Sequence, residues 1–171
     1  LRKNYTSHFK KKKDYQILRE TKILHQKRKD LSKIQIIEFS ILFLIMNFLH
    51  IASKKLEEIS ELKFLSEKNE NLKNIIIAEM SEGKNKETII SKIKLDYINV
   101  IDEINKNSNI QIILKNKTDE DILNLIDELI EDHREQGSLK KIESLEQKLI
   151  NNLDESSFSE LIKLKSQLNR E

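Results

Sequence analysis

The chain has 171 residues, a formal net charge of +2, and 37% hydrophobic against 35% charged residues. This length predicts one or two domains, and the apolar fraction is sufficient for a hydrophobic core rather than a disordered chain. The absence of cysteine excludes disulfides, thiolate zinc sites and cysteine nucleophiles. With no proline, and only Gly83 and Gly137, the sequence favours helices joined by polar turns over sheets rich in tight turns.

The positive charge is concentrated at the start of the chain. Residues 1–33 contain twelve Lys and Arg against three Asp and Glu, a net +9, which leaves −7 for the rest of a chain of net +2. Because the chain begins with Leu1, we expect a piece of a longer protein, with this segment as a linker or the tail of a preceding catalytic domain. The segment is expected to act as a solvated tether, or to bind phosphates weakly and without base specificity. The cations that would bind phosphate are Lys10, Lys11, Lys12, Lys13, Lys27, Arg28 and Lys29.

One apolar stretch, Ile34 to Ala52, dominates the rest of the sequence. Between Phe39 and Leu49 its only polar residues are Ser40 and Asn47. We therefore expect a single helix that is buried on most sides and forms the centre of an all-helical bundle. A membrane span is the alternative, but a span needs about 20 apolar residues. The buried helix is favoured because Glu38 lies near the start of the stretch and Asn47 lies within it.

Shorter apolar patterns follow and predict the partners of this central helix. Ser66 is placed to cap a helix that ends near Gly83. A second helix is expected from Thr88 to Leu95, and Asp96 would cap a third. Residues 110–114 are expected to form a short helix or a packed loop, because no second strand is available to pair with them. The inward-facing residues would be Leu72, Ile75, Ile76, Met80, Ile89, Ile90, Ile93, Tyr97, Ile98, Ile101 and Ile104.

The last third of the sequence predicts an antiparallel helical hairpin. Thr118 or Asp119 would cap its first helix, whose acidic opening turn suits the helix dipole. Gly137 costs only about 1 kcal/mol against Ala, so one long helix with a weak point is feasible. Ser157 and Glu160 have the spacing of a capping box and would open the last helix. The apolar stripes are Ile122, Leu125, Ile126, Leu129, Ile130 and His133, then Leu139, Ile142, Leu145, Leu149 and Leu153, and finally Phe158, Leu161, Leu164 and Leu168.

No catalytic or metal-binding pattern stands out in the sequence. The histidines, His8, His25, His50 and His133, are scattered without the spacing of metal ligands, and His50 is better explained as a helix-end or core polar residue. The acidic residues are expected mainly on solvated helix faces. With two glycines, no phosphate-cradling loop of the Walker type can form. The sequence therefore predicts an interaction module with a tether, and no enzyme activity, cofactor or metal site of its own.

The order of these features resembles the C-terminal helicase-binding domain of bacterial DNA primase. That family often opens this domain with a Glu, an apolar helix and a His-Pro pair, followed by an acidic segment and a leucine-rich pattern. The segments that carry the resemblance are Glu38, ILFLIMNFLH (Ile41–His50), LEEISELKF (Leu56–Phe64), LKNIII from Leu72, and FSELIKLKSQLNRE (Phe158–Glu171). The opening LRKNYTSHF with its basic tail is similar to the end of the family's polymerase core. Ile51 stands where the family commonly has Pro.

The resemblance implies a linker over residues 1–33, a helical bundle over 34–117 and the hairpin over 118–171. The hairpin would bind the N-terminal domains of the hexameric replicative helicase, and the bundle would modulate the helicase. RNA primer synthesis would belong to other domains of the parent chain, a DNA-directed RNA polymerase that uses zinc and magnesium there. The module itself would need no cofactor and no membrane, and would act in the cytoplasm at the replication fork.

The expected helicase contact lies on the final turns of the chain. Its residues would be Lys163, Leu164, Ser166, Gln167, Leu168 and Arg170. The leucines would insert into a groove of the partner, or would pack against Leu145 and Leu149 within the hairpin, and the polar residues would form a rim.

Two other classes of function remain open. A helical nucleic-acid-binding protein would use the basic arm, and its binding would fall steeply with salt. A self-associating coiled coil would use the hairpin, although its leucine pattern is interrupted at Gly137 and Glu146.

Overall fold

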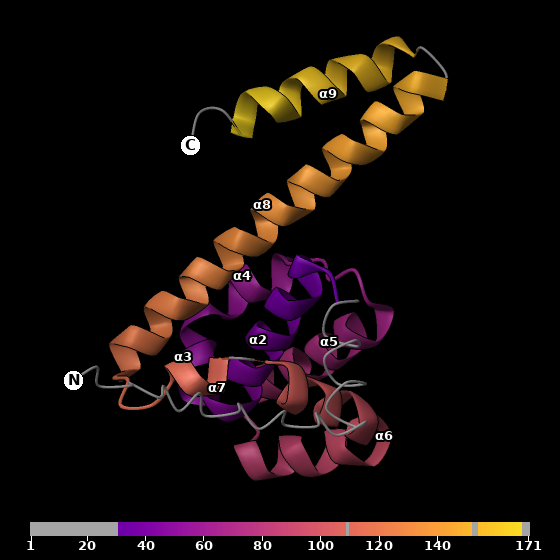
Figure 1. The fold of residues 1–171 in the computed structure, drawn as a ribbon. Coiled ribbons are helices and arrows are strands. Elements are labelled where there is room, and N and C mark those ends of the chain that lie inside the picture. The colour runs from indigo at the N-terminus through magenta and orange to yellow at the C-terminus, as the bar shows by residue number, and fades with distance from the viewer. Residues whose placement is uncertain (1–30, 109, 152–153, 169–171) are drawn as a thin grey trace, which may run out of the picture. The chain divides into compact units, whose positions relative to one another are not determined.

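All regular structure is helical in the part of the chain that the computed structural model describes, residues 31–108, 110–151 and 154–168 (Figure 1). In chain order the elements are α2 (Lys33–Asn47), α3 (Leu49–Ala52), the short 3-10 helix η1 (Ser53–Lys55), α4 (Leu56–Glu61), α5 (Glu67–Ser81), α6 (Lys86–Asn107), α7 (Ile110–Ile113), α8 (Asp119–Asn151) and α9 (Glu155–Leu168). The prediction of an all-α fold is confirmed for these residues. The cations proposed to bind phosphate, from Lys10 to Lys29, lie outside them.

Helix α2 is the central element of the bundle, as its sequence predicts. The helices α5, α6 and α8 all pack against it, so that apolar residues are buried on every side of it. A capping box opens the helix, with the Ser32 N–H donating to Gln35 Oε1 at 3.0 Å. The hydroxyl of Ser40 is buried and donates to the Ile36 carbonyl at 2.9 Å, which satisfies it within the helix.

The predicted single helix from Ile34 to Ala52 is wrong beyond Asn47. The chain leaves the helix at Phe48, whose φ of −126° and ψ of 50° are not helical, and the segment Leu49–Glu61 turns away from α2 by 106°. Lys86 donates to the Asn47 carbonyl at 2.9 Å and so satisfies one of the carbonyl groups exposed at this helix end. The bend lets α3 pack against α8, with Ile51 fully buried in the core.

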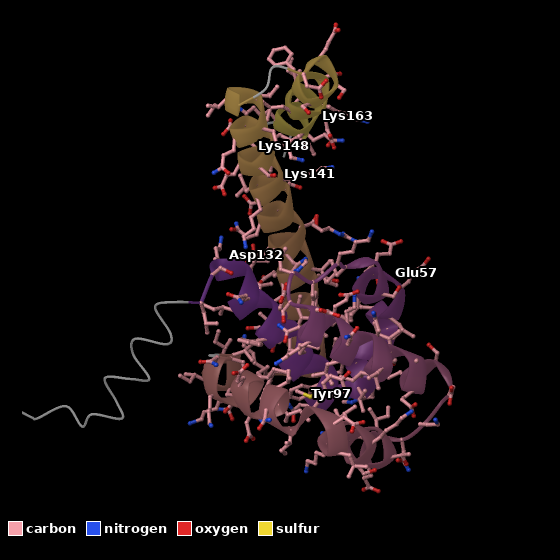
Figure 2. All side chains as sticks on the ribbon, turned by 90° about the vertical axis from the view of Figure 1, so that its right-hand side faces the viewer. Glu57, Tyr97, Asp132, Lys141, Lys148 and Lys163 are labelled. Carbon is pink, nitrogen blue, oxygen red and sulfur yellow. The ribbon has the colours of Figure 1, made fainter. Side chains whose placement is uncertain are left out.

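Two turns shape the middle of the bundle. Helix α5 ends at Ser81, and Gly83 follows with a φ of +73°, a conformation that Gly adopts without steric cost. Helix α6 runs through the boundary predicted at Asp96 and is kinked at Tyr97, whose φ of −119° and ψ of 19° interrupt it (Figure 2). The kink leaves Ile98 46% exposed, whereas the sequence predicted it to face inward. Residues 110–113 form the short helix α7, one of the two forms expected.

Helix α8 is continuous over 33 residues and passes through Gly137 without a break. Thr118 opens it, because the Thr118 N–H donates to Asp121 Oδ2 at 3.0 Å and the Asp121 N–H donates back to Thr118 Oγ1 at 3.2 Å. The Thr118 N–H, followed by its hydroxyl, lowers the pKa of Asp121. The first half of α8 adds Ile122, Ile126 and Ile130 to the main core, and its second half packs against α9.

Within the described residues, no single helix is both long and apolar enough to cross a membrane. Taken together, α2 and the segment Leu49–Glu61 are long and apolar enough to do so, by length and composition alone, but they are bent by 106° relative to each other.

The glycine positions give a direct test of this backbone. We expect Gly137→Ala to raise the free energy of unfolding by about 0.5–1 kcal/mol, because Gly137 is helical and no atom lies within 4 Å of an added Cβ. Gly83→Ala should instead lower it by about 1 kcal/mol or more, because of the positive φ. Urea denaturation followed by circular dichroism measures both, and a loss of stability in Gly137→Ala would contradict a continuous α8.

Candidate protein-interaction site

Helix α9 turns back along the second half of α8 and forms a second apolar cluster with it, separate from the main core (Figure 1). Ile142, Leu145 and Leu161 are buried in this cluster. Partly buried side chains surround it: Leu149, Leu164 and Leu168. The cluster is small, so the association of the two helices depends on few apolar contacts.

Two ion pairs flank this cluster, one on each side. Lys141 Nζ lies 2.6 Å from Glu160 Oε1, and Lys165 Nζ lies 2.7 Å from Glu146 Oε1. All four side chains are about half exposed, so the pairs add little stability and mainly fix how the helices lie against each other. The hydrogen bond from Lys141 lowers the pKa of Glu160.

The start of α9 differs from the prediction. The helix begins at Glu155, three residues before the expected first turn, and its cap is Asp154 rather than Ser157. Asp154 Oδ2 accepts hydrogen bonds from the hydroxyls of Ser156 (2.6 Å) and Ser157 (2.8 Å) and from the Ser157 N–H (3.0 Å). These bonds lower the pKa of Asp154 to about 2. A charged carboxylate binds the free N–H groups of a helix start more strongly than a hydroxyl does, which explains the earlier cap.

A groove lies between α8 and the end of α9. It is lined by Glu131, Arg134, Glu135, Ser138, Leu164, Gln167 and Leu168. Three of the residues expected to bind a partner, Leu164, Gln167 and Leu168, therefore share one surface with a charged part of α8. The two leucines also pack against the apolar cluster, so they take part in the hairpin and line the groove at once.

The other residues expected to bind a partner lie elsewhere. Lys163 and Ser166 are exposed and do not line the groove, and the Ser166 hydroxyl donates to the Lys163 carbonyl at 2.8 Å. Figure 2 labels Lys163 on α9, beside Lys141 and Lys148 of α8. Arg170 lies outside the described residues.

Two residues of the predicted inward stripes are exposed instead. Phe158 and Leu139 lie outside the apolar cluster, because the ion pairs fix which faces of the two helices meet. Leu153 of the same stripes lies outside the described residues.

Sequence reasoning missed a buried polar cluster around Glu38, in the middle of α2. The Glu38 side chain is fully buried, although acidic residues were expected mainly on solvated faces. Its Oε1 accepts from the Leu65 N–H at 2.5 Å, and its Oε2 accepts from the Asn69 amide at 3.0 Å. Glu38 therefore ties the non-helical connection between α4 and α5 to the central helix.

An ion pair within α5, between Lys73 and Glu70, holds the same connection. Lys73 is fully buried, lies 2.9 Å from Glu70 Oε2, and also donates to the Leu62 carbonyl. Glu70 in turn accepts from the Phe64 N–H at 2.9 Å. Burial raises the pKa of Glu70, but the hydrogen bonds from Phe64 and Lys73 outweigh it and hold the pKa below its usual value.

His133 brings α8 into this cluster. Its side chain is only 4% exposed, and its Nε2 lies 3.7 Å from Glu38 Oε1 without a hydrogen-bond partner among the described residues. Its ring centroid is 5.2 Å from that of Phe64. The sequence predicts His133 on the apolar face of its helix and shows Glu38 near the start of the apolar stretch. Each signal was present in the sequence, but nothing in the sequence links them across 95 residues.

The remaining candidates for site chemistry are at the surface. His50 is exposed at the start of α3, and its Nε2 lies 3.3 Å from Asp119 Oδ2. Of the two roles expected for it, it is therefore a helix-end residue rather than a core polar residue. No group of three or more His, Asp or Glu side chains among the described residues is arranged to hold a metal ion. Comparison of the chain with protein-family models, curated proteins and solved structures finds no match.

Removing the Glu38 carboxylate tests the buried cluster. We expect Glu38→Ala to lower the free energy of unfolding by about 3 kcal/mol or more, because the Leu65 N–H and the Asn69 amide would stay buried without an acceptor. Glu103→Ala is the matched control: Glu103 is exposed in α6, and the change should stay within about 0.5 kcal/mol. Urea denaturation measures both, and equal effects would contradict the role of Glu38.

The Asp154 cap predicts a pH dependence of stability. Its pKa rises from about 2 in the folded chain toward 3.8 on unfolding, so the cap stabilises fully above pH 4 and loses this effect as the pH falls to about 2. Asp154→Ser keeps a capping oxygen but does not titrate. We expect the difference in melting temperature, wild type minus Asp154→Ser, to decrease between pH 4 and pH 2. A constant difference would contradict the cap.

Proposed function

We propose that the chain is the helicase-binding module of a bacterial DNA primase, which recruits RNA primer synthesis to the replicative helicase at the fork. The observation that supports this most is the pair formed by α8 and α9: a helical bundle continues through one unbroken helix into a small, weakly packed helical unit with its own groove. This arrangement supports the proposal, because the sequence resemblance implies a bundle followed by a hairpin.

The proposed action is recruitment rather than catalysis. The N-terminal domains of the hexameric helicase would bind the α8–α9 unit, and the basic arm would connect this module to the polymerase domains of the parent chain. A tether raises the local concentration of the domain it carries to about the millimolar range. The primase chemistry, with its zinc and magnesium, would belong to those other domains, and the whole would work in the cytoplasm.

Nucleic-acid binding is the second candidate, favoured by the net charge of +9 in residues 1–33. The two functions make different demands on the chain. Recruitment depends on α9, and its affinity should change little over the salt concentrations that abolish binding through the arm. Binding of nucleic acid through the arm falls steeply as the salt concentration rises, because salt screens the phosphates.

Truncation separates the two. We expect the full chain to co-elute with the hexameric replicative helicase in size-exclusion chromatography with light scattering. A chain that stops at Ser157 should not co-elute, because it lacks most of α9. A chain that lacks residues 1–33 should co-elute as the full chain does. Loss of binding only in the latter chain would favour the basic arm, and no co-elution of the folded full chain at micromolar concentration would contradict recruitment.

A further inference from the structure

Helices α8 and α9 expose large apolar side chains beyond the second cluster. Four such residues are described on these two helices: Leu139 (39% exposed), Ile150 (83%), Phe158 (53%) and Ile162 (54%). Single exposed apolar residues need no explanation, but a group on one surface marks an interaction site. Whether these four form a group depends on the side of the helix pair on which each lies.

The ion pair between Glu146 and Lys165 shows on which side of the helix pair the exposed apolar residues of α8 lie. Leu139 stands seven residues before Glu146 and Ile150 four residues after it, so the three share one face of the helix. This face is next to the buried one, because Ile142 and Leu145 point toward α9.

The same ion pair shows on which side of the helix pair the exposed apolar residues of α9 lie. Phe158 and Ile162 stand seven and three residues before Lys165 and so share its face. Because Lys165 meets Glu146 across the two helices, both apolar rows lie on the same side of the pair. We call this surface, formed by Leu139, Ile150, Phe158 and Ile162, the side face.

The charges that border the side face are acidic. Glu143 lies in the α8 row between Leu139 and Ile150, and Glu155 lies three residues before Phe158. Both are exposed and form no ion pair with described residues. Among the described residues of α8 and α9, the cation on this side is Lys165, which is already paired with Glu146, whereas Lys141 pairs with Glu160 on the opposite side. A partner that covers the side face therefore gains from Lys or Arg at its edge.

We propose that the side face binds an amphipathic helix of the partner, with an apolar stripe bordered by Lys or Arg. Two apolar rows on neighbouring helices accept a third helix as in a helical bundle. A second copy of this chain fits poorly, because its own side face carries the same acidic border, and like charges brought together oppose binding. This inference takes the identity of the partner, the replicative helicase, from the proposed function.

The proposal moves the anchors of the contact away from the residues that sequence reasoning chose. Leu164 and Leu168 already pack within the hairpin, so little of their surface is left for a partner. Phe158 and Ile162 do not belong to the apolar cluster and are about half exposed, so a partner can bury them on binding. A few well-buried apolar anchors usually supply most of the affinity of an interface.

The test measures the affinity of the full chain for the hexameric helicase by isothermal titration calorimetry. We expect Phe158→Ser with Ile162→Ser to weaken binding at least tenfold. The control is Leu95→Ser with Ile112→Ser, which changes apolar residues of α6 and α7 that are more exposed (83% and 76%) and should leave the affinity unchanged. Circular dichroism should show the same helix content in both variants, because all four side chains are exposed.

A second pair of variants tests the acidic border and does not alter the apolar residues. Glu143→Lys with Glu155→Lys should weaken binding several-fold and reduce its dependence on salt, because favourable charge pairs are lost. Glu67→Lys with Glu103→Lys is the control, since Glu67 also opens a helix and Glu103 is also exposed within one. Unchanged binding of the Glu143 and Glu155 variant would contradict a basic border on the partner.

The outcomes separate this inference from the proposed function. If truncation at Ser157 abolishes binding but the Phe158 and Ile162 variant binds as the wild type does, the side face is wrong and recruitment stands. If the wild type does not bind the helicase, both fail. A mass that rises with concentration in light scattering of the chain alone, and that falls in the Phe158 and Ile162 variant, would assign the side face to a second copy and overturn the proposal.

Discussion

The buried carboxylate of Glu38 is the constraint on which the rest of the bundle depends. A polar group buried in an apolar helix is costly unless hydrogen bonds replace those it made with water. The Leu65 N–H and the Asn69 amide supply these bonds, and they can do so only if the connection between α4 and α5 lies across α2. Lys73 holds the same connection from α5, and His133 brings α8 beside it. One polar cluster thus positions two helices, α5 and α8, and the connection between α4 and α5 against the central helix.

Helix α8 joins this constrained bundle to a much weaker unit. Its first half is buried against α2 and is held near Glu38 by His133, whereas its second half shares only a small apolar cluster with α9. A continuous helix transmits the orientation of one end to the other, because its backbone hydrogen bonds leave no free dihedral between them. The bundle therefore sets where the second half of α8 points, and α9 adds a second helix face beside it. Such a division suits a module that presents a binding element to a partner.

Different faces of α9 have different roles in packing. Leu161 stabilises the helix pair, Leu164 and Leu168 pack beside it and line the groove, and Phe158 with Ile162 stays exposed. The apolar surface left exposed is what a partner helix can bury. In the proposed complex, a partner helix would cover this surface and complete a unit of three helices, as amphipathic helices do in other interfaces.

The sequence by itself determined that the chain is helical, that its apolar stretch forms the central helix, and that turns fall near Gly83 and Thr118. Periodicity, capping residues and the absence of proline are local signals, and local signals suffice for these features. Only the tertiary structure decided the bend at Phe48, the pairing of Glu38 with distant groups, and the exposed side of α9. These depend on contacts between residues far apart in the chain. A polar residue in an apolar run shows that it needs a partner, and the packing of the helices decides which one it finds.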